Sequence, residues 1–156
     1  MNTLLLLVLL LTLIVPLWSQ VETVAMHTTG ISCGVCAAVS EINLKRMPGV
    51  ERVAISLAKE EIILSFKAEA AFSPRRIREV LQPLEVGVVQ FQISARGYVQ
   101  GQDGKRFFMA GKDKFVLVPT GDAPLPRDTA VLIEAILNDR LEPMELKILS
   151  FKPLKP

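Results

Sequence analysis

Two cysteines, Cys33 and Cys36, carry the most reactive side chains of this sequence and lie in the segment TTGISCGVCAAV. They are the only cysteines among the 156 residues, so at most one intramolecular disulfide can form. Two thiolates without a set of oxygen donors favour soft ions such as Cu(I) or Hg(II) over calcium or magnesium. The same pair is also compatible with a dithiol–disulfide redox couple or with a purely structural role.

The cysteines follow a predicted strand, VETVAMHTT, and open a predicted helix, CGVCAAVSEINLKRM. Cys36 then falls in the first helical turn, where unpaired backbone N–H groups and the helix dipole stabilise a thiolate. The Cys-x-x-Cys spacing at a helix start also lets both sulfurs point at one ion. Apolar spacing along this helix predicts a buried face that contains Cys36, Val39, Leu44 and Met47.

The rest of the first half alternates between strand and helix signals. A Pro-Gly pair ends the first helix, and Ser73 followed by Pro74 is typical of the start of a second helix. The last strand of this half alternates with Val89 on its predicted inner face. The order βαββαβ predicts a ferredoxin-like domain over residues 21–95, and thus an α+β protein. The predicted elements lie at 21–29, 33–47, 50–57, 61–67, 73–84 and 86–94.

From about residue 96 the chain changes to short segments rich in β-forming residues, separated by Gly, Asp and Pro turn signals. The segment TAVLIEAIL is compatible with a helix by periodicity, but alternation through Val131, Ile133 and Ala135 favours a strand. Five or so strands in this part predict a second, small all-β domain at 96–156. An OB-like barrel is the architecture that fits best.

The N-terminal run from Leu4 to Val15 is apolar and is followed by Pro16. Its length is typical of a signal-peptide core, because a membrane span needs about 20 apolar residues. We expect residues 1–20 to be a signal peptide or an uncleaved membrane anchor, with a tether through residues 4–18. The protein is then extracytoplasmic, either periplasmic or secreted, where a free thiol pair calls for a function.

The segments around the cysteines, together with KRMPGVERVAISLAKEEIILSF and SPRRIREVLQPL, resemble the heavy-metal-associated domain. This is the ferredoxin-like module of copper chaperones, periplasmic mercury-binding proteins and metal-pumping ATPases. The resemblance covers residues 22–94. Gly30 opens the loop as in the family, and Met47-Pro48-Gly49-Val50 matches the turn into the second strand.

The resemblance implies that Cys33 and Cys36 are the metal ligands. It also implies that Cu(I) is the expected ion, with Hg(II) or another soft ion possible, and that the ion passes by ligand exchange. The partner would be a metal donor or acceptor, such as a transporter or an ATPase metal-binding domain. Three positions depart from the family pattern: Ile31 replaces the usual Met, Ser40 stands at an apolar position, and Val86 stands in a region where some members have a Lys.

Other donor residues are few. His27 is the single histidine, so it is a possible third ligand, although an ordinary exposed strand position is the simpler interpretation. Met26 is a possible thioether donor, and a core position is simpler for it. One histidine allows no Ser-His-Asp arrangement, and no Gly-rich phosphate loop is present. We therefore predict that the protein is not an enzyme.

Two basic regions remain. For the first, on the second helix, we predict a solvated face, with docking to an acidic partner or to lipid headgroups as the alternative. For the second, in the C-terminal part, we predict a barrel core and no nucleic acid, because the net charge is only +2 and the chain is expected to be exported. The residues concerned are Arg75, Arg76 and Arg78, and Tyr98, Phe107, Phe108 and Phe115 with their neighbouring lysines.

Two other functions stay open at this point. One is an extracytoplasmic dithiol–disulfide redox protein that uses the same cysteines. The other is a non-catalytic adaptor that binds a protein through its ferredoxin-like domain.

Overall fold

The computed structural model describes residues 19–119 and 124–155; the predicted leader falls almost wholly outside these ranges. Among the described residues, no helix is long and apolar enough to cross a membrane. The elements in chain order are β1 (Gln20–Thr29), α2 (Gly34–Lys45), β2 (Val50–Ser56), β3 (Glu61–Phe66), α3 (Pro74–Leu81), a 3-10 turn (Gln82–Leu84), β4 (Gly87–Gln102), β5 (Lys105–Ala110), β6 (Asp113–Leu117), β7 (Val131–Asn138) and β8 (Glu145–Pro153).

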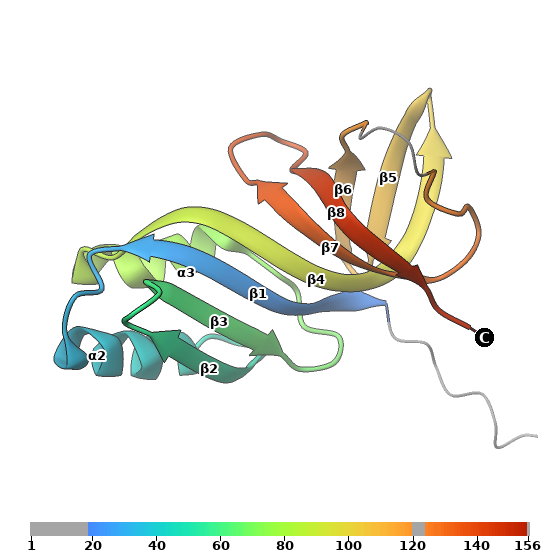
Figure 1. The fold of residues 1–156 in the computed structure, drawn as a ribbon. Coiled ribbons are helices and arrows are strands. Elements are labelled where there is room, and N and C mark those ends of the chain that lie inside the picture. The colour runs from blue at the N-terminus through green and yellow to red at the C-terminus, as the bar shows by residue number, and fades with distance from the viewer. Residues whose placement is uncertain (1–18, 120–123, 156) are drawn as a thin grey trace, which may run out of the picture.

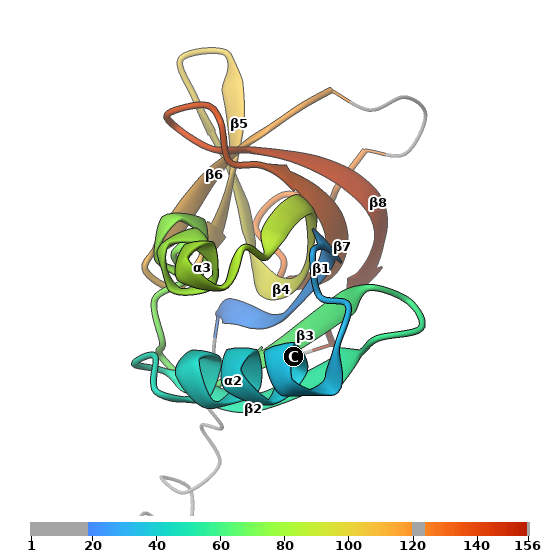
Figure 2. The same ribbon diagram turned by 90° about the vertical axis from the view of Figure 1, so that its left-hand side faces the viewer.

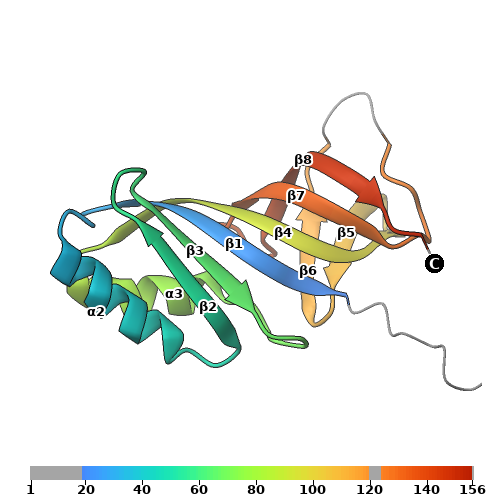
Figure 3. The same ribbon diagram turned by 60° about the horizontal axis from the view of Figure 1, so that its bottom comes forward.

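The N-terminal lobe, from β1 to the first half of β4, has the predicted βαββαβ order. Its four strands form an antiparallel sheet in the order β2-β3-β1-β4. Helices α2 and α3 lie on the same face of this sheet (Figures 1 and 3). The second helix starts as its sequence predicts, because the Ser73 hydroxyl accepts a hydrogen bond from the Arg76 N–H at 3.3 Å and Pro74 follows it. The ferredoxin-like prediction is therefore confirmed for this lobe.

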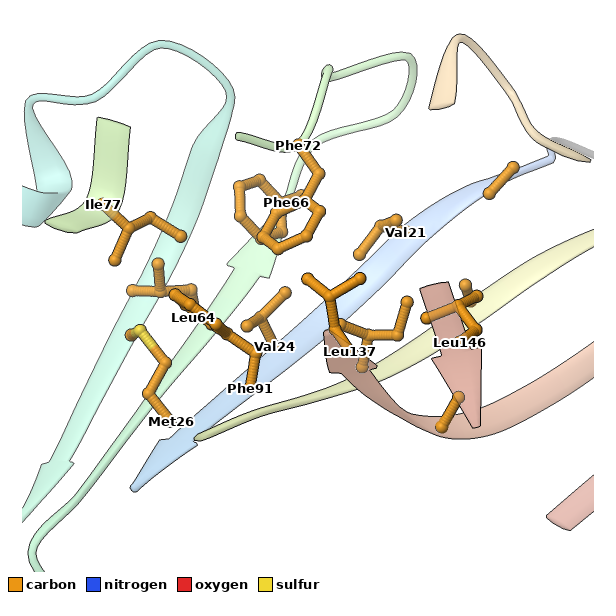
Figure 4. Close-up of a cluster of buried hydrophobic side chains, with 14 of the residues drawn as sticks. Val21, Val24, Met26, Leu64, Phe66, Phe72, Ile77, Phe91, Leu137 and Leu146 are labelled. Atoms are coloured by element: carbon orange, nitrogen blue, oxygen red, sulfur yellow. The ribbon is translucent and has the colours of Figure 1, made fainter. Parts of the chain in front are cut away.

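Apolar side chains fill the space between the sheet and the helices. Met26, Leu64 and Ile77 have no exposed surface and come from β1, β3 and α3 (Figure 4). The same buried cluster continues along β1 and β4 to Leu137 and Leu146 of the last two strands (Figure 4). One hydrophobic core thus runs through both halves of the chain.

The long strand β4 belongs to both halves. Its first part pairs with β1 on one edge and with β7 on the other, and its last part pairs with β5. Strands β4 to β8 close into a ring in the order β4-β5-β6-β8-β7, in which β6 and β8 run parallel (Figure 1). We call this ring the C-terminal lobe. Gly97 lies at the point where β4 passes from its pairing with β7 to its pairing with β5.

The ring begins inside a strand that the sequence divides. The sequence predicts separate strands on either side of residue 96, but the structure contains one continuous strand through the predicted boundary at 95/96. The predicted strand over TAVLIEAIL is confirmed, with Val131, Ile133 and Ala135 buried inside the ring. No linker separates the two lobes at this position, so they share backbone hydrogen bonds as well as core.

Two predicted core positions are wrong. Val89 is 63% exposed because the pairing of β1 with β4 shifts register next to it, which leaves Val89 outside the alternation. Val39 is 37% exposed, since the buried face of α2 is centred on Ser40 and Leu44. A helix with apolar residues on two faces does not indicate which one is buried.

Candidate metal site

The loop between β1 and α2 brings both cysteines to the start of α2. This loop lies at the end of the N-terminal lobe that points away from the ring (Figure 1). Cys33 is the N-cap of α2, with an extended backbone, and its Sγ accepts a hydrogen bond from the Cys36 N–H at 3.1 Å. The Cys33 carbonyl accepts the first helical bond from the Ala37 N–H at 3.0 Å. A sulfur therefore occupies the capping position that a hydroxyl or carboxylate usually takes.

The two sulfurs are joined as a disulfide, and the Cα atoms of the two residues are 5.2 Å apart. Cys33 is exposed and Cys36 is half-buried. Because the backbone already holds both side chains toward one point, reduction leaves two thiols at a common position on the surface. The arrangement can hold a small ion between the sulfurs or alternate between dithiol and disulfide.

Gly30 shapes the loop before the cysteines. Its φ is +84°, and a Cβ at this position would lie 2.3 Å from the carbonyl oxygen of Glu85. The turn between α3 and β4 therefore presses directly on the start of the loop (Figure 2). Sequence reasoning identified the glycine but not this contact, which joins residues more than fifty positions apart.

Comparison with known proteins agrees with this geometry. Residues 27–85 match the sequence model of the heavy-metal-associated domain. This part of the chain belongs to that family. The heavy-metal-associated domain thus covers the loop, both helices and the first three strands.

Solved structures of similar proteins include the copper form of CopA from Bacillus subtilis, at 35% identity and a TM-score of 0.39, covering 46% of this chain and 93% of that one. A CopZ metallochaperone is 18% identical with a TM-score of 0.40, covering 44% of this chain and 100% of that one. A yeast copper transporter domain, CCC2A, is also 18% identical, with a TM-score of 0.39 and coverages of 44% and 94%. No curated protein matches the chain.

The positions that depart from the family pattern differ in their surroundings. Ile31 is 1% exposed, so it packs in the core as expected for a residue of this volume. Ser40 is fully buried in α2, and its hydroxyl has no hydrogen-bond partner. Val86 is buried beside the loop, within 3.7 Å (Cα) of the position of a Cβ on Gly30. The heavy-metal-associated domain of this chain therefore has an apolar side chain where a lysine would bring positive charge to the sulfurs.

No further ligand joins the cysteines in the described part of the chain. Residues 19–119 and 124–155 contain no group of three or more His, Cys, Asp and Glu side chains placed to hold a metal. His27 is exposed on β1, opposite Glu61 and Gln90 of the neighbouring strands. Met26 is completely buried. The simpler interpretations of both residues, a solvated strand position and a core position, are confirmed.

The two basic regions divide between solvent and structure. Arg75 is solvated and pairs with Glu79 one turn along α3, and Arg76 is exposed. Arg78 instead pairs with Asp139 of the C-terminal lobe. This interlobe pair could not be found from the sequence, because no local pattern relates the two residues.

The aromatic residues of the C-terminal lobe also divide. Phe108 and Phe115 are fully buried inside the ring, as the core interpretation predicts. Phe107 lies on the outside, with the Lys114 Nζ 4.1 Å from the centre of its ring, and Tyr98 is 37% exposed. The outer pair is too small to form a stacking surface for bases.

Proposed function

We propose that reduced Cys33 and Cys36 bind one soft metal ion, Cu(I) in the first place, and pass it to another protein. The observation that carries the proposal is the convergence of two cysteine sulfurs at an exposed helix start within a heavy-metal-associated domain. Two thiolates satisfy Cu(I) or Hg(II), which accept low coordination numbers, and do not satisfy calcium or magnesium. The lack of a third donor group in the described residues supports the same class of ion.

Transfer to a partner follows from the exposure of Cys33. A thiolate of the partner attacks the bound ion and forms a three-coordinate intermediate, after which one of the two cysteines leaves. The oxidation state of the metal does not change, and the ion is never free in solution. The partner is a metal donor or acceptor protein, such as a transporter or the metal-binding domain of an ATPase.

A dithiol–disulfide redox function is the second candidate, and the disulfide between the two cysteines favours it. Such a protein would exchange its disulfide with a substrate protein through a mixed disulfide. The metal-binding function and the redox function make opposite predictions for a reduced chain mixed with Cu(I). A non-catalytic adaptor, in contrast, would keep its partner after both cysteines are replaced.

The proposal places the protein outside the cytoplasm, in the periplasm or secreted, with residues 1–20 as a signal peptide or anchor. The support for this location is the apolar run from Leu4 to Val15. We propose an OB-like barrel for the ring of β4 to β8, supported by its five-strand closed order with parallel β6 and β8. Its role is to hold the metal-binding lobe rigidly, because the two lobes share β4.

The test is a Cu(I) titration of the reduced chain, beginning at Ser19, in competition with a coloured Cu(I) chelator such as bicinchoninate. We expect one tightly bound Cu(I) per chain and its loss in Cys33→Ser and in Cys36→Ser. Ser32→Ala is the matched control, because it changes an exposed residue of the same loop without removing a sulfur. Binding that is weak, or that survives either cysteine substitution, would contradict the proposal, and a Hg(II) titration of the same variants compares the two ions.

A further inference from the structure

Helix α2 has an apolar face that nothing in the described chain covers. Its inner face is buried around Ser40 and Leu44. On the opposite side are Val35, which is 74% exposed, Val39, which is 37% exposed, and Ile42, which is 50% exposed. Ala38 lies between them and is exposed as well. We call these four residues the outer stripe; it begins two residues after Cys33.

Scattered exposed apolar residues are ordinary on protein surfaces, but a row at helical spacing marks a contact surface. The four residues follow the spacing i, i+3, i+4 and i+7, so they line one side of the helix. Elsewhere, the exposed Val89 and Leu149 each lie at a register shift in β4 or β8, without an apolar neighbour in helical register. The outer stripe is therefore the surface on which to look for a partner.

We infer that the outer stripe binds the same stripe of a second copy of this chain, with the two α2 helices antiparallel. The spacing of the stripe is symmetric about a point between Ala38 and Val39. In an antiparallel pair, Val35 of one copy therefore lies opposite Ile42 of the other, and Ala38 lies opposite Val39. A two-fold interface requires such self-complementarity, and the small Ala38 at its centre allows the helices to approach closely.

The charges at the two ends of α2 favour the same arrangement. Arg46 is exposed and lies one turn beyond Ile42, so it continues the outer stripe at its C-terminal end. The symmetry places Arg46 of each copy level with Ile31 and Ser32 of the other, beside that copy's cysteine loop. Lys45 is already paired with Glu41 on the flank of the helix. Arg46 is therefore the charge available to face the loop.

The metal strengthens this contact, a step that rests on the proposed function. Two thiolates holding one Cu(I) carry a net charge of −1, and Val86 leaves the chain's own loop without a cation near that charge. Arg46 of the second copy supplies it. We expect Cu(I) to tighten the dimer roughly tenfold, because two such exposed charge contacts form per dimer.

The geometry separates this dimer from one that a shared metal ion holds together. The 12 residues of α2 span about 18 Å, and antiparallel packing places the two cysteine loops at opposite ends of the paired helices. One ion therefore cannot bridge the two copies. The stripe of each copy is smaller than the roughly 800 Å² per partner of a standard interface, so association is weak and needs concentrated protein.

The experiment is sedimentation equilibrium of the reduced chain beginning at Ser19, up to several hundred micromolar, with and without one equivalent of Cu(I). We expect a reversible monomer–dimer equilibrium that Cu(I) tightens. Ile42→Glu should be monomeric under both conditions while keeping its folded circular dichroism spectrum and its Cu(I) stoichiometry. Val89→Glu is the matched control and should dimerise like the unchanged chain, because Val89 is an exposed valine away from α2.

Two further variants test the arrangement and separate it from the proposed function. Arg46→Glu should dimerise without metal but lose the tightening by Cu(I). The double variant Cys33→Ser, Cys36→Ser should keep the metal-free dimer while binding no Cu(I). Monomeric unchanged chain at every concentration, or a dimer that survives Ile42→Glu, would overturn the inference, whereas failure of the metal function alone would appear as absence of Cu(I) binding with the stripe dimer intact.

Discussion

Arg78 of α3 and Asp139, just after β7, form an ion pair with two hydrogen bonds that joins the two lobes. The Arg78 Nε donates to Asp139 Oδ2 at 2.7 Å, and Nη2 donates to Oδ1 at 3.0 Å. The remaining Nη1 donates to the Val88 carbonyl at 2.7 Å, and the guanidinium lies 4.9 Å from the centre of the Phe91 ring. This one side chain thus fixes α3 against both β4 and the C-terminal lobe.

Replacing Asp139 by Asn should destabilise the protein by about 1–3 kcal/mol, because it weakens two charge-assisted hydrogen bonds to a half-buried arginine. The free energy of unfolding is measured by urea denaturation. Glu79→Gln is the control, since the Arg75–Glu79 pair on the same helix is exposed and should contribute less than about 1 kcal/mol. Equal effects of the two substitutions would show that the interlobe pair adds nothing beyond an ordinary surface ion pair.

The sequence predicts the N-terminal lobe well because its signals are local. Alternation identifies β3, the Ser-Pro pair marks the start of α3, and the buried Leu64 and Ile77 follow from their periodicity. The exposed Val89 is missed because a register shift depends on the partner strand, which no local pattern contains. The continuity of β4 is missed for the same reason, since its second half is held by pairing with β5 and β7.

The candidate site shows the same division. Cys33, Cys36 and Gly30 are visible in the sequence, because two sulfurs and a flexible residue at a helix start have a recognisable spacing. The support from Glu85 depends on the packing of the turn after α3 and is not visible. The outer stripe on α2 could have been found from its i, i+4, i+7 spacing, but the same helix offers a second apolar face.

Gly97→Ala should destabilise both lobes together. A Cβ at Gly97 would lie 2.1 Å from the Met109 carbonyl oxygen and 2.8 Å from the Phe108 ring, so β4 and β5 would have to separate. Overpacking of this kind costs about 1–3 kcal/mol. Because the lobes share β4 and one core, we expect a single unfolding transition at lower urea concentration, followed by both tryptophan-independent circular dichroism and amide exchange.

The control for this substitution is Gly101→Ala on the same strand. The nearest atom to a Cβ at Gly101 is the Lys105 carbonyl oxygen at 4.0 Å, so the added methyl group meets no obstacle. Its unfolding curve should stay close to that of the unchanged chain. Two separate transitions in Gly97→Ala would contradict the shared core as the source of cooperativity.

Gly30→Ala should weaken the cysteine site, whereas Gly34→Ala should leave it intact. Gly30 has a φ of +84° and faces the Glu85 carbonyl oxygen, so a methyl group strains the backbone and pushes the loop outward. The strain alone costs more than about 1 kcal/mol. Gly34 lies between the two cysteines, and a Cβ there would have nothing within 4 Å.

The measurement for this pair is the same chelator competition, combined with urea denaturation. We expect Gly30→Ala to lose both Cu(I) affinity and stability, and Gly34→Ala to keep both. Similar Cu(I) affinities in the two variants would mean that the contact between Gly30 and Glu85 does not position the sulfurs.

Asp113 gives the protein a stability term that depends on pH. Burial at the start of β6 raises the pKa of Asp113 above its ordinary value of 3.8, and the hydrogen bond from the Phe72 N–H, at 3.1 Å, opposes this only in part. Between the ordinary and the raised pKa, the folded carboxyl holds its proton while the unfolded one has lost it. The folded state then binds more protons, so the free energy of unfolding falls as the pH rises through this window.

Asp113→Asn removes this term and keeps an oxygen that can accept the Phe72 N–H. The stability of the variant relative to the unchanged chain should therefore rise from pH 4 toward neutral pH, as measured by urea denaturation at each pH. Glu51→Gln, which removes an exposed carboxylate from β2, controls for the change in net charge. A stability difference for Asp113→Asn that stays constant or falls with increasing pH would show that the hydrogen bond to Phe72, and not burial, dominates the titration of this carboxyl group.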